Sequence, residues 1–159
     1  MIRFVRSTLS ALFVSLPILF AAPTISAAAE DPLITKPSPH DVPTTVQRLE
    51  AAVNSRGAAV VAKIDHAAAA EASGLSLRPT VLVLFGNPKL GTPLMQSEQT
   101  AGLDLPLRVL VWQDADGTTH VGYTPPNLIA TRHGITDRPE VVEKIAGALA
   151  AIADETTAP

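Results

Sequence analysis

One stretch, Arg78 to Thr124, decides the fold of this chain, and it contains the runs Arg78-Pro79-Thr80-Val81-Leu82-Val83-Leu84-Phe85-Gly86-Asn87-Pro88 and Leu105-Pro106-Leu107-Arg108-Val109-Leu110-Val111-Trp112. Both runs are rich in Val and Leu, and each is stopped by Gly, Pro, Asn or Asp. Short apolar runs bounded by such residues are typical of strands in the middle of a sheet. The sequence Asp114-Ala115-Asp116-Gly117 then predicts a hairpin into a third strand, because Gly accepts the positive φ that a tight turn needs.

The segment before these strands has helical and extended patterns in turn. Asp41 is a candidate N-cap, the apolar residues after it recur at helical spacing, and Gly57 fits the C′ position of that helix. Residues 58–65 are expected to form a strand. An alanine-rich short helix over residues 66–73 follows, with Asp65 as its cap.

The segment after the first apolar run predicts further helices. We expect a loop over residues 86–91 and a short helix that Thr92 caps and that stops near Gly102. Another short helix is expected over residues 127–133. The last helix opens at Asp137 with a capping-box pattern.

The two ends of the chain carry weaker signals. Residues 1–29 have the basic, apolar and small-residue regions of a cleavable signal peptide, which predicts a periplasmic or secreted protein cut near Ala29. Residues 30–40 are expected to be an extended lead-in with an edge strand near Ile34, residues 41–153 a single domain, and residues 154–159 a disordered tail.

Composition excludes several classes of protein. Cleavage near Ala29 leaves 10 basic and 15 acidic residues, a net charge of about −5, which argues against nucleic-acid partners and against an anionic membrane surface. The chain has no cysteine, so thiol nucleophiles, covalent c-type haem and cysteine-ligated metal centres are excluded. No cofactor motif is present, and no disulfide can hold the exported fold together.

Three pieces of the sequence together resemble the domain of unknown function 302 (DUF302) family: Ile64-Asp65-His66, Pro79 through Gly86-Asn87-Pro88, and Leu105-Pro106-Leu107-Arg108. The resemblance extends from about Asp41 to Ile152. It implies an α+β fold similar to the TATA-binding-protein-like class: a curved antiparallel sheet of about four or five strands with helices packed on one face. The resemblance also implies a homodimer, the form in which this fold often occurs. It implies no catalytic residue, and fold alone does not fix function.

The candidate ligand-binding residues are Asp65, His66, Asn87, Lys89, Arg108 and Tyr123. Asp65 and His66 could act as an acid–base pair, although an N-cap followed by a polar helix residue explains them more simply. Asn87 and Lys89 lie in a Gly-Asn-Pro-Lys loop that could bind an anion, although a structural turn is the simpler explanation.

The remaining candidates lie on predicted strands. Arg108 interrupts an apolar strand, so its charge needs a partner or a path to solvent. It could bind a ligand carboxylate, pair with Asp104, Asp114 or Glu71, or lie at a dimer seam. Tyr123 could lie beside Trp112 across the hairpin, either as core packing or as a pocket wall.

The sequence leaves three functional hypotheses open. The first is a non-enzymatic homodimeric module that binds a small molecule or a protein between the sheet and its covering loops. The second is an enzyme that uses Asp65, His66 or His133 for acid–base chemistry, which requires such residues to converge in one cleft. The third is a periplasmic binder of a copper-type metal through scattered histidines and Met95, although no metal-ligand spacing supports it.

Overall fold

The computed structural model describes residues 33–159, and the predicted signal peptide lies outside the described residues. The chain forms a single antiparallel sheet in the order β1-β5-β4-β3-β2. The central strands are β3 (Thr80–Gly86), β4 (Leu107–Gln113) and β5 (Thr119–Tyr123), and the edges are β1 (Ile34–Ser38) and β2 (Ala59–Asp65). This is the α+β architecture that the sequence predicts, with the two apolar runs side by side as β3 and β4.

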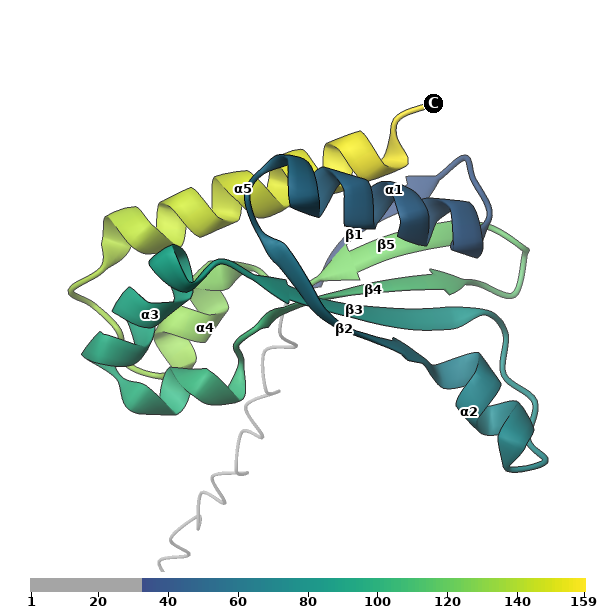
Figure 1. The fold of residues 1–159 in the computed structure, drawn as a ribbon, viewed down its shortest axis with the longest axis horizontal. Coiled ribbons are helices and arrows are strands. Elements are labelled where there is room, and N and C mark those ends of the chain that lie inside the picture. The colour runs from purple at the N-terminus through teal and green to yellow at the C-terminus, as the bar shows by residue number, and fades with distance from the viewer. Residues whose placement is uncertain (1–32) are drawn as a thin grey trace, which may run out of the picture.

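Two long helices cover one face of the sheet (Figure 1). They are α1 (Val42–Ser55) and α5 (Pro139–Thr157), and they also pack against each other. Their apolar stripes meet the inward side chains of the strands in one core. That core includes Leu49 of α1, Val83 and Phe85 of β3, and Ile145 and Leu149 of α5, all at most 2 % exposed.

The shorter helices lie at the two ends of the sheet. At one end are α3 (Pro88–Ser97), the 3₁₀ helix η1 (Gln99–Leu103) and α4 (Pro126–Arg132). At the other end, α2 (His66–Ala72) extends beyond β2 and β3, away from the two long helices (Figure 1). No residue of α2 is buried.

The second face of the sheet has no helix stacked on it in Figure 1. Because side chains alternate along a strand, this open face carries the residues between the core positions: Leu82 and Leu84 of β3, and Arg108, Leu110 and Trp112 of β4. Most of these side chains are half-buried against their neighbours in the sheet.

Two of the four predicted N-caps are present, at Asp41 and Asp65, and two are not, because Thr92 lies inside α3 and Asp137 does not cap α5. The Asp41 carboxylate accepts the Thr44 N–H at 2.9 Å, and the Asp65 carboxylate accepts the Ala68 N–H at 2.9 Å. The capping box at Asp137 is wrong: Arg138 holds the N-cap position without a side-chain cap, and the Asp137 carboxylate instead accepts the Ser97 hydroxyl. The Asp137 carboxylate therefore contacts α3 instead of capping α5.

Helix α3 and the C-terminus also differ from the predictions. The expected loop over 86–91 is wrong, because α3 begins at Pro88 with Asn87 as its N-cap. Helix α5 continues to Thr157, where a disordered tail was expected. This last turn is held because Thr156 is fully buried and its carbonyl accepts a 3.0 Å hydrogen bond from Nε of Arg48.

Candidate functional site

An apolar cavity of about 520 Å³ lies where the ends of β3 and β4 meet α3 and α5. The two sequence runs that define the fold supply much of its wall, through Phe85-Gly86-Asn87-Pro88 and Leu105-Pro106-Leu107. The volume lies within the range of about 300–1,000 Å³ that is usual for small-molecule sites. Helix α5 closes one side with the side chains Ile145, Ala148, Leu149 and Ile152.

Small residues keep this cavity open. Gly86 and Gly91 both line it, and a Cβ at Gly91 would lie 3.6 Å from Cδ1 of Leu105. Ala58 and Ala148 also line it, where larger side chains would fill the space. The pocket therefore depends on residue size at a few positions.

Asn87 lines the pocket, but both ends of its side chain are used within the protein. Its Oδ1 accepts the Lys89 N–H at 2.9 Å, and its Nδ2 donates to the Gly57 carbonyl at 3.0 Å. Asn87 thus caps α3 and joins it to the loop after α1. This is a structural role, and it explains why an Asn stands between Gly86 and Pro88.

Arg56 is the one charged residue of the pocket wall among the described residues. Its Nη1 pairs with the Glu155 carboxylate and also donates to the Ala52 carbonyl at 3.1 Å. Its charge is therefore balanced within the protein. The remaining surface of the cavity is almost entirely hydrocarbon, which suits an uncharged apolar molecule.

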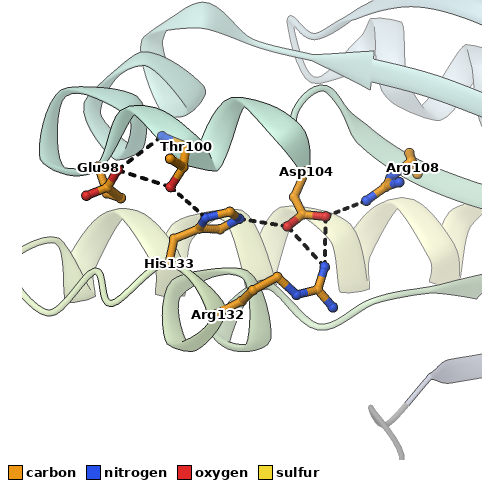
Figure 2. Close-up of polar contacts among 6 residues, drawn as sticks. All are labelled: Glu98, Thr100, Asp104, Arg108, Arg132 and His133. Atoms are coloured by element: carbon orange, nitrogen blue, oxygen red, sulfur yellow. Dashed lines mark hydrogen bonds and ion pairs between the residues drawn. The ribbon is translucent and has the colours of Figure 1, made fainter.

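A second group of polar side chains surrounds Asp104, whose carboxylate is 7 % exposed (Figure 2). Arg108 Nη2 donates to Oδ1 at 2.6 Å, and Arg132 Nη1 donates to both oxygens at 3.0 and 3.1 Å. His133 Nε2 lies 2.8 Å from Oδ2. The opposite ring nitrogen of His133, Nδ1, lies 3.0 Å from Oγ1 of Thr100.

The partners of Asp104 determine its charge. Burial raises the pKa of this carboxyl, but hydrogen bonds from His133 and Arg132 and the charges of Arg132 and Arg108 outweigh burial, so the pKa is lowered. An ionised carboxylate only accepts hydrogen bonds, so His133 Nε2 must be the donor. The tautomer of the imidazole is therefore fixed by its neighbour.

The predicted site residues do not converge. Asp65 caps α2, His66 is exposed at the start of the same helix, and Lys89 is exposed on α3. Arg108 is on the open face of the sheet. Tyr123 pairs with Val109 on the core side, and burial raises the pKa of its hydroxyl.

Two predicted contacts, one between Trp112 and Tyr123 and one between Arg108 and a carboxylate, can be compared directly with the structure. Trp112 pairs with His120, and the rings stack with centroids 5.2 Å apart, so Trp112 and Tyr123 point to opposite faces. The expected pairing of Trp112 with Tyr123 is wrong. Of the three carboxylates considered as partners of Arg108, Asp104 is the one that pairs with it.

Sequence reasoning missed the roles of Glu98, Thr100 and Arg132. The sequence offers one signal for this group, the acidic Asp104 four residues before Arg108. The other residues around Asp104 are spaced along the chain with no local pattern. Within residues 33–159, no group of three or more His, Cys, Asp or Glu side chains could hold a metal ion. In the same part of the chain, no helix is long and apolar enough to cross a membrane.

Comparison with known proteins relates the chain to longer sequences. A protein named fluoride-specific ion channel FluC 1, from Brucella suis biovar 1 (strain 1330), is 40 % identical over 121 residues, which are 76 % of this chain and 48 % of that protein. A protein named fluoride-specific ion channel FluC 2, from Brucella melitensis biotype 1, is also 40 % identical over 121 residues, with 45 % of its length covered. The chain thus spans about half the length of these curated relatives.

A solved structure and a family profile support the same fold. The crystal structure of an uncharacterized conserved DUF302 protein from Bacillus stearothermophilus superposes with a TM-score of 0.72 at 23 % identity, over 78 % of this chain and 97 % of that one. The profile described as "Domain of unknown function DUF302" matches residues 34–152, most of the described chain. The chain therefore belongs to the DUF302 family.

Proposed function

We propose that this protein is a binding module whose pocket between β3, β4, α3 and α5 holds, without catalysis in that pocket, a small, uncharged apolar molecule. The supporting observation is the apolar wall of that cavity, built by the Phe85–Pro88 and Leu105–Leu107 segments. Each CH₂ group that a ligand buries there contributes about 0.8 kcal/mol. The polar side chains Asn87 and Arg56 already have partners, so the pocket selects against a charged ligand.

Titration of ¹⁵N-labelled protein with 1-decanol tests this proposal, and decanoate serves as the charged control. We expect amide shifts at Gly86 and Gly91 with 1-decanol and much weaker shifts with decanoate, because Arg56, the one cation among the described residues of the wall, is already paired with Glu155. Shifts confined to Leu82, Leu110 and Trp112 would place the ligand on the open face of the sheet. That result, or no shift up to the solubility of 1-decanol, would contradict the proposal.

The proposed active form is a homodimer that uses the open face and edge strand β2. Most of β2 is exposed, including Val61 at 64 % and Ile64 at 42 %. Its outer N–H and C=O groups face away from β3, and a second β2 strand can pair with them around a two-fold axis. Ile64 lies on the open-face side of β2, beside Leu82 of β3, and we expect it to contact the partner strand.

Sedimentation of the Ile64→Glu variant tests the dimer, with Leu103→Glu as the matched control. Leu103 is 81 % exposed and lies in η1, at the other end of the sheet from α2. We expect the wild type and the Leu103 variant to sediment as dimers and the Ile64 variant as a monomer. A monomeric wild-type protein, or a dimer that Ile64→Glu leaves intact, would contradict the proposed interface.

Export is part of the same proposal and rests on residues 1–29. N-terminal sequencing of the protein recovered from the periplasm or medium of its host is expected to begin near residue 30. An intact N-terminus in the cytoplasmic fraction would contradict export.

A second candidate function comes from the relatives named fluoride-specific ion channels, which are 40 % identical over the aligned region. In this reading the domain acts beside a fluoride channel. Deletion of the gene is then expected to make growth more sensitive to fluoride. Unchanged fluoride sensitivity, in a host that retains its channel, would argue against this role.

A further inference from the structure

The side chains Asp104, His133 and Thr100 form a hydrogen-bonded row that links a buried carboxylate to an exposed hydroxyl (Figure 2). His133 Nε2 lies 2.8 Å from Asp104 Oδ2, and His133 Nδ1 lies 3.0 Å from Thr100 Oγ1. The Asp104 and His133 side chains are each 7 % exposed, whereas Thr100 is exposed. A hydroxyl within reach of a base, with the base oriented by a third group, is the arrangement of an activated nucleophile.

We propose that Thr100 is a nucleophile that accepts an acyl group from small activated esters of apolar acids, with His133 as its base. This site is separate from the apolar pocket, since neither Thr100 nor His133 lines that cavity. The inference does not depend on what the pocket binds.

The surroundings of His133 prepare it to take a proton. Asp104 is ionised and fixes the imidazole with Nε2 as donor, which leaves Nδ1 as the acceptor toward Thr100. His133 is also the C-cap residue of α4, and a cation is favoured at the C-terminal end of a helix. The Asp104 carboxylate and the C-terminal end of α4 therefore both lie beside the ring that receives the Thr100 proton.

Glu98 provides a second acceptor for the same hydroxyl. Its Oε1 lies 3.0 Å from Thr100 Oγ1 and also accepts the Thr100 backbone N–H at 3.2 Å. These contacts hold the threonine in one orientation at the start of η1. The hydroxyl carries one proton and lies 3.0 Å from each of two acceptors, so it donates either to Glu98 Oε1 or to His133 Nδ1.

The neighbouring surface indicates the class of acyl group. Residues three apart in a 3₁₀ helix lie on the same side, so Leu103 of η1 lies on the side of Thr100. Leu103 is 81 % exposed, more than any other large hydrophobic residue of the described chain. An apolar acyl or aryl group beside the reacting hydroxyl would cover the exposed Leu103 side chain. A charged acyl group would make no favourable contact with that side chain.

The reaction is a single acyl transfer. Oγ1 of Thr100 forms a bond to the carbonyl carbon of the ester while its proton moves to Nδ1 of His133. The bond from the carbonyl carbon to the leaving oxygen then breaks, and the proton passes from His133 to that oxygen unless it leaves as a stable phenolate. The products are acyl-Thr100 and the alcohol or phenol.

Incubation of the full chain with p-nitrophenyl butyrate, followed by intact-mass analysis and peptide mapping, tests the proposal. We expect one butyryl group on the peptide that contains Thr100, together with release of one equivalent of p-nitrophenolate. Thr100→Val is expected to remove this label, and Thr100→Ser to retain it. His133→Gln is expected to slow labelling by about 100-fold, the usual contribution of a general base.

Thr131→Val is the matched control, since this exposed threonine of α4 donates to the Asn127 carbonyl and has no histidine contact. It should label at the wild-type rate. Absence of butyryl from Thr100, or equal labelling rates in the wild type and His133→Gln, would overturn the proposal. Because Thr100 is exposed, circular dichroism of Thr100→Val is expected to show an intact fold. Ala148→Phe, which alters the apolar pocket, should still be labelled at Thr100.

Discussion

The Trp112 ring lies against the backbone of Gly122, its diagonal neighbour across β4 and β5. A Cβ atom at Gly122 would lie 2.8 Å from Cζ3 and 3.0 Å from Cη2 of Trp112. The same ring stacks on His120, so it cannot move freely to make room. The open face of the sheet therefore requires glycine at this position for reasons of space.

Gly122→Ala is predicted to destabilise the protein by about 1–3 kcal/mol, the usual cost of overpacking. Urea unfolding measures the loss, and near-ultraviolet circular dichroism should show a changed Trp112 environment. Gly147→Ala is the control with the opposite sign. Gly147 lies within α5, where an added Cβ would meet no atom within 4 Å, and a helix-interior Gly→Ala change stabilises by about 0.5–1 kcal/mol. Equal effects of the two substitutions would contradict the packing at Gly122.

Asp104→Asn is predicted to destabilise the protein by about 2–3 kcal/mol at neutral pH, since hydrogen bonds to charged groups contribute roughly 1.5–3 kcal/mol. The change leaves Arg108, Arg132 and His133 without their shared carboxylate. Both arginines are about half exposed, so solvent screens part of the loss. Asp116→Asn in the exposed hairpin turn is the control and should change stability little.

The stability of the wild type and that of Asp104→Asn are also expected to depend differently on pH. The pKa of Asp104 is lower in the folded than in the unfolded protein, so its carboxylate stabilises the fold at pH values above its unfolded pKa of about 3.9. This contribution is lost as the pH falls through the lower, folded pKa. The stability difference between the wild type and Asp104→Asn is therefore expected to be largest above about pH 5 and to shrink in acid. A difference that stays constant down to acid unfolding would contradict the ionised carboxylate.

Asn87→Ala is predicted to cost about 1–2 kcal/mol, because it removes the N-cap of α3 and the bond to the Gly57 carbonyl. Asn87 also lines the pocket, so Asn87→Ala is expected to weaken 1-decanol binding because this part of the pocket wall is then held less rigidly. Lys89→Ala, two residues further on, is the control, because the exposed Lys89 side chain contributes neither bond. Equal stability of the two variants, measured by urea unfolding, would show that Asn87 does not hold the loop.

The sequence was sufficient for features that depend on local pattern. The β3 and β4 runs, the Asp41 and Asp65 caps and the apolar stripe of α5 follow from residue type and spacing, and the structure has all of them. The start of α3 was missed because Gly86-Asn87-Pro88 fits both a turn and an N-cap followed by Pro at N1.

The candidate site was less predictable because tertiary contacts build it. Asp104 meets Arg132 and His133 from a helix that begins 22 residues later in the chain, and no local spacing marks such a contact. Asp137 was assigned to a cap from its own neighbours, but Ser97 of another helix competes for its carboxylate. The pocket likewise arises where α5 crosses the ends of two strands.

The central claim, that the pocket binds an uncharged apolar molecule, is tested most directly by calorimetric titration of 1-decanol into the wild type and Ala148→Phe. Ala148 lines the cavity, and a phenyl ring there would project into the space that the ligand needs, whereas Ala51→Phe adds the same ring on the exposed side of α1. We predict that the wild type and the Ala51 variant bind with the same affinity and that Ala148→Phe loses binding by at least about 10-fold, or 1.4 kcal/mol. Unchanged binding in a folded Ala148→Phe protein would contradict the account.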